Sequence, residues 1–280
     1  ARRLFADLLG CKPGQVIAGG NSSLEMMFDA VSKAYTHGLL HSESLGKLDR
    51  VKWICPVPGY DRHFKVTESF GMELLSVPMT ETGPDMDRVE QLIRDEVRGM
   101  WNVPKYSNPT GITYSLETIH RLAAMKPAAP DFMLMWDNAT ASTSWGGFVP
   151  FPDILSLCAE YGNGDMVYEF ASTSKITFPG AGIACGAVSE ANVEYSDLLN
   201  IQIISYDKMN QLRHVRYLKD KETTLGPDAA SCGHSGAKFR AVEDERTATW
   251  PPGHRHWSHP KGGYFQLDAM PGTARRALEL

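Results

Sequence analysis

The strongest constraint on the fold is a set of short apolar runs in which polar and apolar residues do not alternate. We predict six of them as strands: residues 51–57, 73–78, 100–104, 132–136, 166–170 and 183–188. Strands of this kind are buried on both faces, as happens when helices cover both sides of a mostly parallel sheet. Segments with helical spacing of apolar residues lie among them, at 23–35, 85–97, 115–125 and 190–204. The sequence therefore predicts a three-layer α/β/α fold.

The regular pattern of strands and helices ends near residue 205. We therefore predict a large domain over residues 1–205, and a connecting helix with an incomplete small domain over 206–280. Between residues 221 and 260 glycine and proline are frequent and neither helical nor strand periodicity is clear, so we predict irregular chain there. Order is expected to resume with a strand at 261–270 and a terminal helix at 271–280.

Composition narrows the class of protein. The chain has 280 residues, 42% of them hydrophobic, with a net charge of -5 and no basic run, which indicates a globular protein without a nucleic-acid or membrane surface. No apolar segment approaches the roughly 20 residues needed to cross a bilayer. The five cysteines are far apart and several lie in apolar runs, which predicts reduced thiols and a cytoplasmic protein. We expect small-molecule partners.

The most informative motif is Ser172-Thr173-Ser174-Lys175, which directly follows an apolar run. A lysine there can act as an amine nucleophile, and Ser172 and Ser174 can donate hydrogen bonds to an anion. A Schiff-base lysine beside a phosphate needs this combination. The alternative is a solvated lysine in a polar loop, which is the commoner outcome for such a motif.

Two further motifs follow predicted strands. Asn108-Pro109-Thr110-Gly111 marks a turn at the carboxyl end of a strand, the edge where open α/β sheets bind ligands, although an ordinary turn would have the same sequence. Asp137 ends the apolar run FMLMWD. A buried carboxylate there needs a cationic partner, such as a protonated pyridine nitrogen, whereas the alternative is a helix N-cap.

Two more segments can hold a ligand. Gly19-Gly20-Asn21-Ser22 leads into the first long helical segment, where backbone N–H groups and the positive helix end favour an anion. Ser22 and Glu25 also form a capping box, which explains the local sequence without a ligand. Pro58-Gly59-Tyr60 follows another predicted strand, and Tyr60 can stack on a flat heteroaromatic ring.

In this order, the segments GGNSSLEM, PGYDRH, NPTG, WDNA and STSK resemble the fold-type I aminotransferases that depend on pyridoxal 5′-phosphate (PLP). In detail, GGNSSLEMM, YSNPTGITYS and STSKITFPGAGI are similar to the MocR-like subgroup, which includes a bacterial type of aspartate aminotransferase. The resemblance covers about residues 1–220 and returns at 260–280. It implies the large domain of that fold with a partial α+β small domain, PLP as cofactor, a homodimer, and transamination between aspartate and 2-oxoglutarate.

The resemblance also implies roles for single residues. Lys175 forms the Schiff base with PLP and moves the proton at the substrate carbon, and Asp137 keeps the pyridine nitrogen protonated. Asn108 binds the phenolic oxygen, Tyr60 stacks on the ring, and His63 orients Asp137. The phosphate is expected to lie against Gly20, Asn21, Ser22, Ser172 and Ser174.

Several departures from the family pattern weaken the expected site. Thr140 stands where relatives often have a tyrosine, and Gly182 stands where they commonly have a phosphate-binding arginine. The chain begins without Met and ends before the position of the arginine that grips the substrate carboxylate in the family. We therefore expect a fragment or a degenerate form with impaired activity.

Two other interpretations stay open. The first is a non-catalytic PLP-binding regulatory module of MocR type, although no DNA-binding motif precedes residue 1. The second is a zinc site formed by Cys232, His234, His254, His256 and His259. The spacing of these residues departs from that of zinc motifs, so we expect no metal site.

Overall fold

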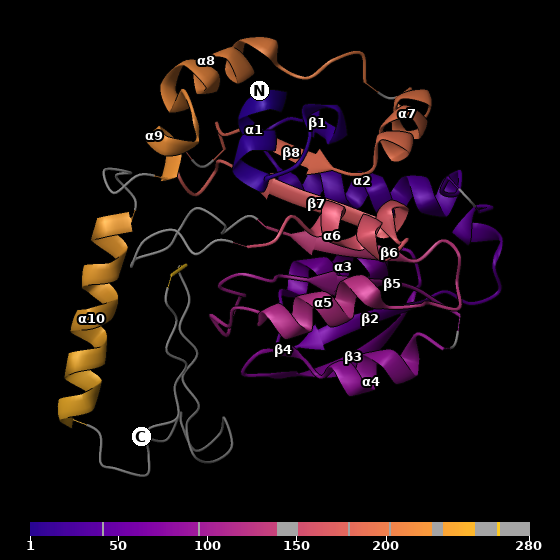
Figure 1. Cartoon of the computed structure of the whole chain (residues 1–280), viewed down its shortest axis with the longest axis horizontal. Coiled ribbons are helices and arrows are strands. Elements are labelled where there is room, and N and C mark those ends of the chain that lie inside the picture. Colours follow the sequence, from indigo (N-terminus) through magenta and orange to yellow (C-terminus); the bar gives the residue numbers. More distant parts are fainter. Residues whose placement is uncertain are drawn as a thin grey trace.

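A computed structural model describes residues 1–40, 42–94, 96–138, 151–178, 180–201, 203–225, 232–249 and 262–263. Within them the chain forms an eight-stranded sheet in the order β1-β8-β7-β6-β5-β2-β3-β4 (Figure 1). The strands are β1 Val16–Ala18, β2 Lys52–Val57, β3 Glu73–Thr80, β4 Gly83–Pro84, β5 Val97–Asn102, β6 Met133–Asp137, β7 Val167–Ser172 and β8 Ala184–Ala187.

The sheet is mostly parallel, as predicted. Strands β3, β2, β5, β6 and β7 are parallel neighbours, while β8 runs antiparallel to β7 and β1, and β4 antiparallel to β3. All six predicted strands are confirmed to within a few residues. The sequence missed β1 and β4, which are only three and two residues long and too short to show a periodicity.

Helices cover both faces of the sheet. They are α1 Arg2–Leu9, α2 Ser23–Thr36, α3 Asp61–Ser69, α4 Met86–Leu92, α5 Leu116–Ala124, α6 Ile154–Glu160, α7 Glu190–Leu198, α8 Lys208–Leu218, α9 Lys221–Leu225 and α10 Cys232–Thr249, with short 3-10 helices η1 Pro13–Gln15, η2 Leu45–Lys47 and η3 Gly164–Met166. Buried residues of α1, α4, α5 and α6 pack on one face, and those of α2, α3 and α7 pack on the other. The predicted three-layer fold is confirmed.

The prediction of irregular chain over residues 221–260 is wrong where the structure describes it. Helices α9 and α10 lie there, and the described side chains of α10 are exposed or half-buried. Because α10 buries no apolar stripe, it shows no helical periodicity, yet its alanine, glutamate, lysine and arginine residues favour a helix. In Figure 1 α10 lies apart from both faces of the sheet.

The described residues do not test three of the predictions. The predicted strand at 261–270 and helix at 271–280 lie outside the described residues, apart from Gly262 and Gly263. The domain boundary at residue 205 stays a prediction. Within the described ranges, no helix has both the length and the apolar character that a membrane span requires.

Candidate functional site

The predicted site residues lie at one edge of the sheet. Strands β2, β5, β6 and β7 are parallel neighbours, so their carboxyl ends share that edge. Tyr60, Asn108, Asp137 and Lys175 follow or end these four strands in turn. All four side chains line one cavity of about 440 Å³. Among the residues that the structure describes, the lining is Asn21, Ser22, Ser23, Leu24, Tyr60, Val103, Tyr106, Asn108, Asp137, Ser172, Ser174 and Lys175.

One part of this cavity is built to hold an anion. Helix α2 begins there, and its N-cap Ser22 accepts a hydrogen bond from the Glu25 N–H at 3.2 Å, as the capping motif predicts. The Ser174 hydroxyl donates to the Asn21 carbonyl at 3.1 Å, and the Ser172 hydroxyl donates to Ser174 at 2.9 Å. The positive end of the helix and the two hydroxyls therefore meet at the same place.

Gly20 is the one predicted phosphate residue that does not line the cavity. Its carbonyl accepts the Ala184 N–H at 2.6 Å, and the Gly19 N–H donates to the Ala184 carbonyl at 2.8 Å. These two bonds fasten the glycine turn to β8, beside β7. Gly20 thus positions the start of α2 from behind the cavity wall.

The carboxylate at the end of β6 has a histidine partner. His63 Nε2 lies 3.0 Å from Asp137 Oδ2, and His63 is only 1% exposed. Its ring stacks on Trp101, with 4.6 Å between the centroids, and meets Tyr60 edge-on at 5.0 Å. The imidazole is therefore fixed in orientation, and it fixes Asp137 in turn.

Two ionisable groups of the cavity have shifted pKa values. Burial lowers the pKa of the Lys175 amine from its usual value, and the nearby Asp137 charge opposes this effect. Burial also raises the pKa of the Tyr60 hydroxyl, and Asp137 adds to the increase. A lysine that loses its proton more readily is a better nucleophile and base near neutral pH.

Sequence reasoning missed residues that line or support the cavity. Tyr106 lines it from the loop that carries Asn108, and its nearness to that motif was the available signal. Helix α8 forms hydrogen bonds with two loops beside the cavity, those that contain Gly182 and Gly19. Its Asn210 amide donates to the Gly182 carbonyl at 3.0 Å, and its Gln211 amide donates to the Gly19 carbonyl at 3.2 Å. No local motif in α8 indicates these long-range contacts.

The structure gives a physical reason for the departure at Gly182. A Cβ added there would lie 3.0 Å from the backbone nitrogen and the hydroxyl of Ser174, and 3.0 Å from the Thr173 hydroxyl. A side chain at this position would therefore require Ser174 and the Thr173 hydroxyl to move by a few tenths of an ångström. The other departure, Thr140, lies outside the described residues.

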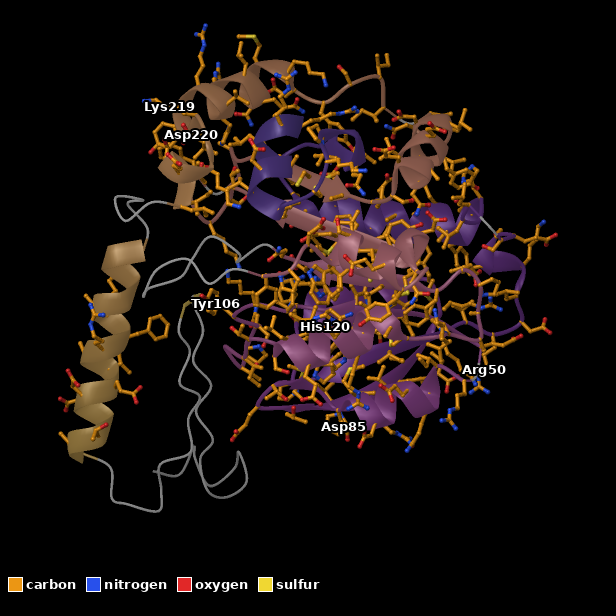
Figure 2. The ribbon with its side chains drawn as sticks, viewed as in Figure 1. Arg50, Asp85, Tyr106, His120, Lys219 and Asp220 are labelled. Atoms are coloured by element: carbon orange, nitrogen blue, oxygen red, sulfur yellow. The ribbon has the colours of Figure 1, made fainter. Side chains whose placement is uncertain are left out.

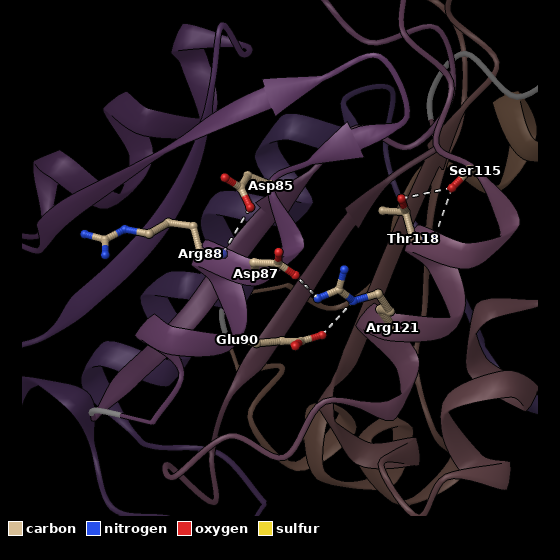
Figure 3. A network of polar contacts seen from close by, with 7 residues as sticks. All are labelled: Asp85, Asp87, Arg88, Glu90, Ser115, Thr118 and Arg121. Atoms are coloured by element: carbon tan, nitrogen blue, oxygen red, sulfur yellow. Dashed lines mark hydrogen bonds and ion pairs between the residues drawn. The ribbon is translucent and has the colours of Figure 1, made fainter.

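A second hollow, of about 310 Å³, lies between the starts of α4 and α5. Figure 3 shows that its arginine is already paired: Arg121 donates to Glu90 at 2.8 Å and to Asp87 at 2.6 Å. The side chains of Asp85 and Ser115 cap the two helices. Because these groups satisfy one another, we assign the functional site to the larger cavity.

The zinc interpretation is not tested by the described residues. The side chains of Cys232 and His234 are not described, and His254, His256 and His259 lie outside the described ranges. Across the part of the chain that is described, no group of three or more histidine, cysteine, aspartate or glutamate residues could hold a metal ion.

Known proteins resemble this chain in both sequence and fold. The family model for aspartate aminotransferase matches residues 1–280. An aspartate aminotransferase from Corynebacterium glutamicum is 46% identical over 287 residues, covering 100% of this chain and 66% of the relative, so the chain spans just under two thirds of that relative's length. The crystal structure of an aspartate transaminase from the same species superimposes with a TM-score of 0.91 at 46% identity, covering 99% of this chain and 67% of the other.

A more distant structure extends the similarity of fold. An alpha-aminoadipate aminotransferase from Thermus thermophilus, complexed with N-(5′-phosphopyridoxyl)-L-leucine, superimposes with a TM-score of 0.75 at 22% identity and covers 99% of this chain and 69% of that one. The names of these relatives favour an enzyme over a non-catalytic regulatory module.

Proposed function

Because the chain belongs to the aspartate aminotransferase family, whose members are PLP-dependent enzymes of fold type I, we propose that it transfers an amino group between aspartate and 2-oxoglutarate. One observation carries the proposal. Lys175, Asp137 and the anion-binding start of α2 line the same cavity of about 440 Å³.

The polar side chains of this cavity match the chemical groups of PLP. Ser172, Ser174 and the first turn of α2 suit a phosphate, which accepts hydrogen bonds and is stabilised by the positive end of a helix. The Asp137 carboxylate suits a protonated ring nitrogen. The Lys175 amine suits an aldehyde, and the cavity volume lies in the range of small-molecule sites, roughly 300–1,000 Å³.

When bound, PLP supplies an electrophilic aldehyde carbon and a conjugated ring that accepts the electron pair left at the substrate Cα. Lys175 would hold that aldehyde and, as a free amine, would take the proton from the substrate Cα. Its lowered pKa increases the fraction of neutral amine at neutral pH. Asn108 is placed to donate to the phenolic oxygen, and Tyr60 to cover one face of the ring.

Asp137 and His63 act together in this proposal. Asp137 would accept a hydrogen bond from the protonated ring nitrogen of PLP, while His63, 3.0 Å away, prevents the carboxylate from rotating out of place. The stacking of His63 on Trp101 keeps the imidazole itself in position. His63 is therefore a positioning residue, whereas Asp137 would contact the cofactor itself.

We also propose the finer features that the resemblance implies. These are the MocR-like subgroup, a homodimer, a large domain over residues 1–205, a partial small domain over 206–280, and a cytoplasmic location. Four cysteines of the described ranges, Cys11, Cys55, Cys158 and Cys185, are free thiols, which supports a reducing compartment.

A spectroscopic titration tests the proposal. PLP added to the purified chain should give a visible absorbance band of bound cofactor, and aspartate with 2-oxoglutarate should yield glutamate. Lys175→Ala should abolish the band and lower the turnover by about 10²–10⁴-fold or more, because the base at the substrate Cα is lost. Lys126→Ala, at an exposed lysine that binds the Tyr161 carbonyl, is the matched control. A band that persists in Lys175→Ala would refute the role of Lys175.

A further inference from the structure

Among the described residues of the cavity wall, Tyr106 is the one aromatic side chain to which the proposed chemistry gives no role. It is 1% exposed and lies on the loop between β5 and Asn108. Its backbone φ is +50°, in the left-handed region, which is uncommon and strained for a bulky residue. Such a conformation persists only where the surroundings enforce it.

The first element that enforces it is the neighbouring lysine. Lys105 is 1% exposed, and its Nζ lies 5.6 Å from the centroid of the Tyr106 ring and 5.7 Å from that of Phe151. An ammonium group at this distance is attracted to the faces of both rings. The Tyr106 N–H also donates to the Thr113 hydroxyl at 3.3 Å, which fastens the loop from its other side.

The second element comes from the far end of the chain. Gly263 has a φ of +79°, and a Cβ added to it would lie only 2.6 Å from the Cβ of Tyr106. Gly262 and Gly263 are both buried, and Gly263 lies directly against this tyrosine. Figure 2 labels Tyr106 on the side of the α/β body that faces this turn, which Figure 1 draws in yellow.

We propose that Tyr106 is a specificity-determining residue that contacts the side chain of the substrate amino acid, and that Lys105 and the Gly262–Gly263 turn position its ring. The lining groups with a proposed role are engaged elsewhere: the hydroxyls of Ser172 and Ser174 with the phosphate, Asp137, Asn108 and Tyr60 with the ring, and Lys175 with the aldehyde. Among the described lining residues, Tyr106, Leu24 and Val103 are the aromatic and aliphatic side chains left without a role, and Tyr106 is the largest of them. The ring of Tyr106 is therefore placed to contact the side chain of the substrate amino acid. The specificity role rests on the proposed function, whereas the positioning role does not.

Hydrogen exchange tests the positioning role without cofactor or substrate. Gly263→Ala places a methyl group against Tyr106, so amides of residues 103–113 should exchange at least about threefold faster than in the unmodified chain. Gly162→Ala is the matched control, since Gly162 has a φ of +78° and nothing within 4 Å of the added Cβ. It introduces the same backbone strain and should leave the 103–113 amides unchanged. Unchanged exchange in Gly263→Ala would overturn the positioning role.

Kinetics and cofactor titration test the specificity role. Tyr106→Ala should raise the KM for aspartate about tenfold, because one aromatic contact with the substrate is lost. The kcat and the PLP dissociation constant should stay within about threefold of those of the unmodified chain. Gly263→Ala should raise the same KM, and the double variant should match Tyr106→Ala alone, because the turn acts through the ring. Tyr106→Phe, which keeps the ring, should restore the KM.

Two results would overturn the specificity role. One is an unchanged KM in Tyr106→Ala, and the other is a loss of PLP affinity equal to the rise in KM, which would mark a merely structural residue. If the unmodified chain binds no PLP, the proposed function and the specificity role fail together. The exchange measurement then still decides whether Gly263 positions Tyr106.

Discussion

Glu169 is a carboxylic acid inside the central sheet, and its replacement gives the most sharply defined change in stability. It lies on β7, paired with Trp136 of β6 and Ala187 of β8, and is 2% exposed. Its Oε1 accepts a hydrogen bond from the Asn138 amide at 2.9 Å, whereas its Oε2 has no hydrogen-bond partner. Burial raises the pKa of Glu169 to about 8, and the nearby charge of Asp153 adds to the increase.

The magnitude follows from the difference between the two pKa values. Between the ordinary value of 4.5 and about 8, Glu169 is protonated in the folded chain and ionised in the unfolded chain. The folded state therefore binds more protons, and the free energy of unfolding falls by up to about 1.4 kcal/mol for each pH unit. Glu169→Gln stays neutral and can still accept from Asn138. Its stability relative to the unmodified chain should rise by about 3–4 kcal/mol from pH 5 to pH 8.

Urea unfolding at pH 5, 6, 7 and 8, followed by tryptophan fluorescence, measures this difference. The exposed Glu81→Gln, in the turn between β3 and β4, is the matched control and should show no such trend. The thiols of Cys11 and Cys185 also interact with Glu169, and both have raised pKa values, so they stay protonated across this range. A difference between Glu169→Gln and the unmodified chain that stays constant, or falls, as pH rises would refute the reasoning.

Two further comparisons test the energetics of buried groups. Asp131→Ala should lower the free energy of unfolding by about 3–5 kcal/mol, because the buried Arg98 guanidinium loses its partner at 2.5 Å and keeps the exposed Glu96 carboxylate at 3.8 Å. Arg121→Ala in the exposed network of Figure 3 should cost less than about 1 kcal/mol. Urea unfolding measures both losses, and equal losses would contradict the argument. His63→Phe keeps a ring but removes the bond to Asp137, so it should weaken PLP binding about tenfold in a spectroscopic titration, and unchanged affinity would count against a positioning role.

The sequence predicted the part of the site that is built from local signals. Asn108, Asp137 and Lys175 each follow an apolar run that is buried on both faces, and such runs identify parallel strands. Parallel neighbours place their carboxyl ends at one edge, so the three side chains meet in one cavity. The strand order itself was not predictable, because it depends on how the helices cross over the sheet.

The missed residues act through contacts between distant parts of the chain. Tyr106 has no motif of its own, and Gly263, which packs against it, is 157 positions away in the sequence. Glu169 lies in an apolar run, so its burial could be inferred but not the partner of its carboxyl group. Helix α10 was missed for the opposite reason, since it buries no apolar stripe and therefore shows no periodicity.

The anion-binding part of the cavity depends on neutral donors, and this explains why α8 matters to it. Lys175 is the one cationic side chain among the described residues that line the cavity, and Gly182 provides no side-chain charge. Dipoles attract an anion over a shorter range than a full charge does, so hydroxyl and N–H groups must be held accurately in place. The amides of Asn210 and Gln211 provide this by binding the carbonyls of Gly182 and Gly19, on the two segments that flank the start of α2. Loss of these contacts would therefore weaken phosphate binding although neither residue lines the cavity.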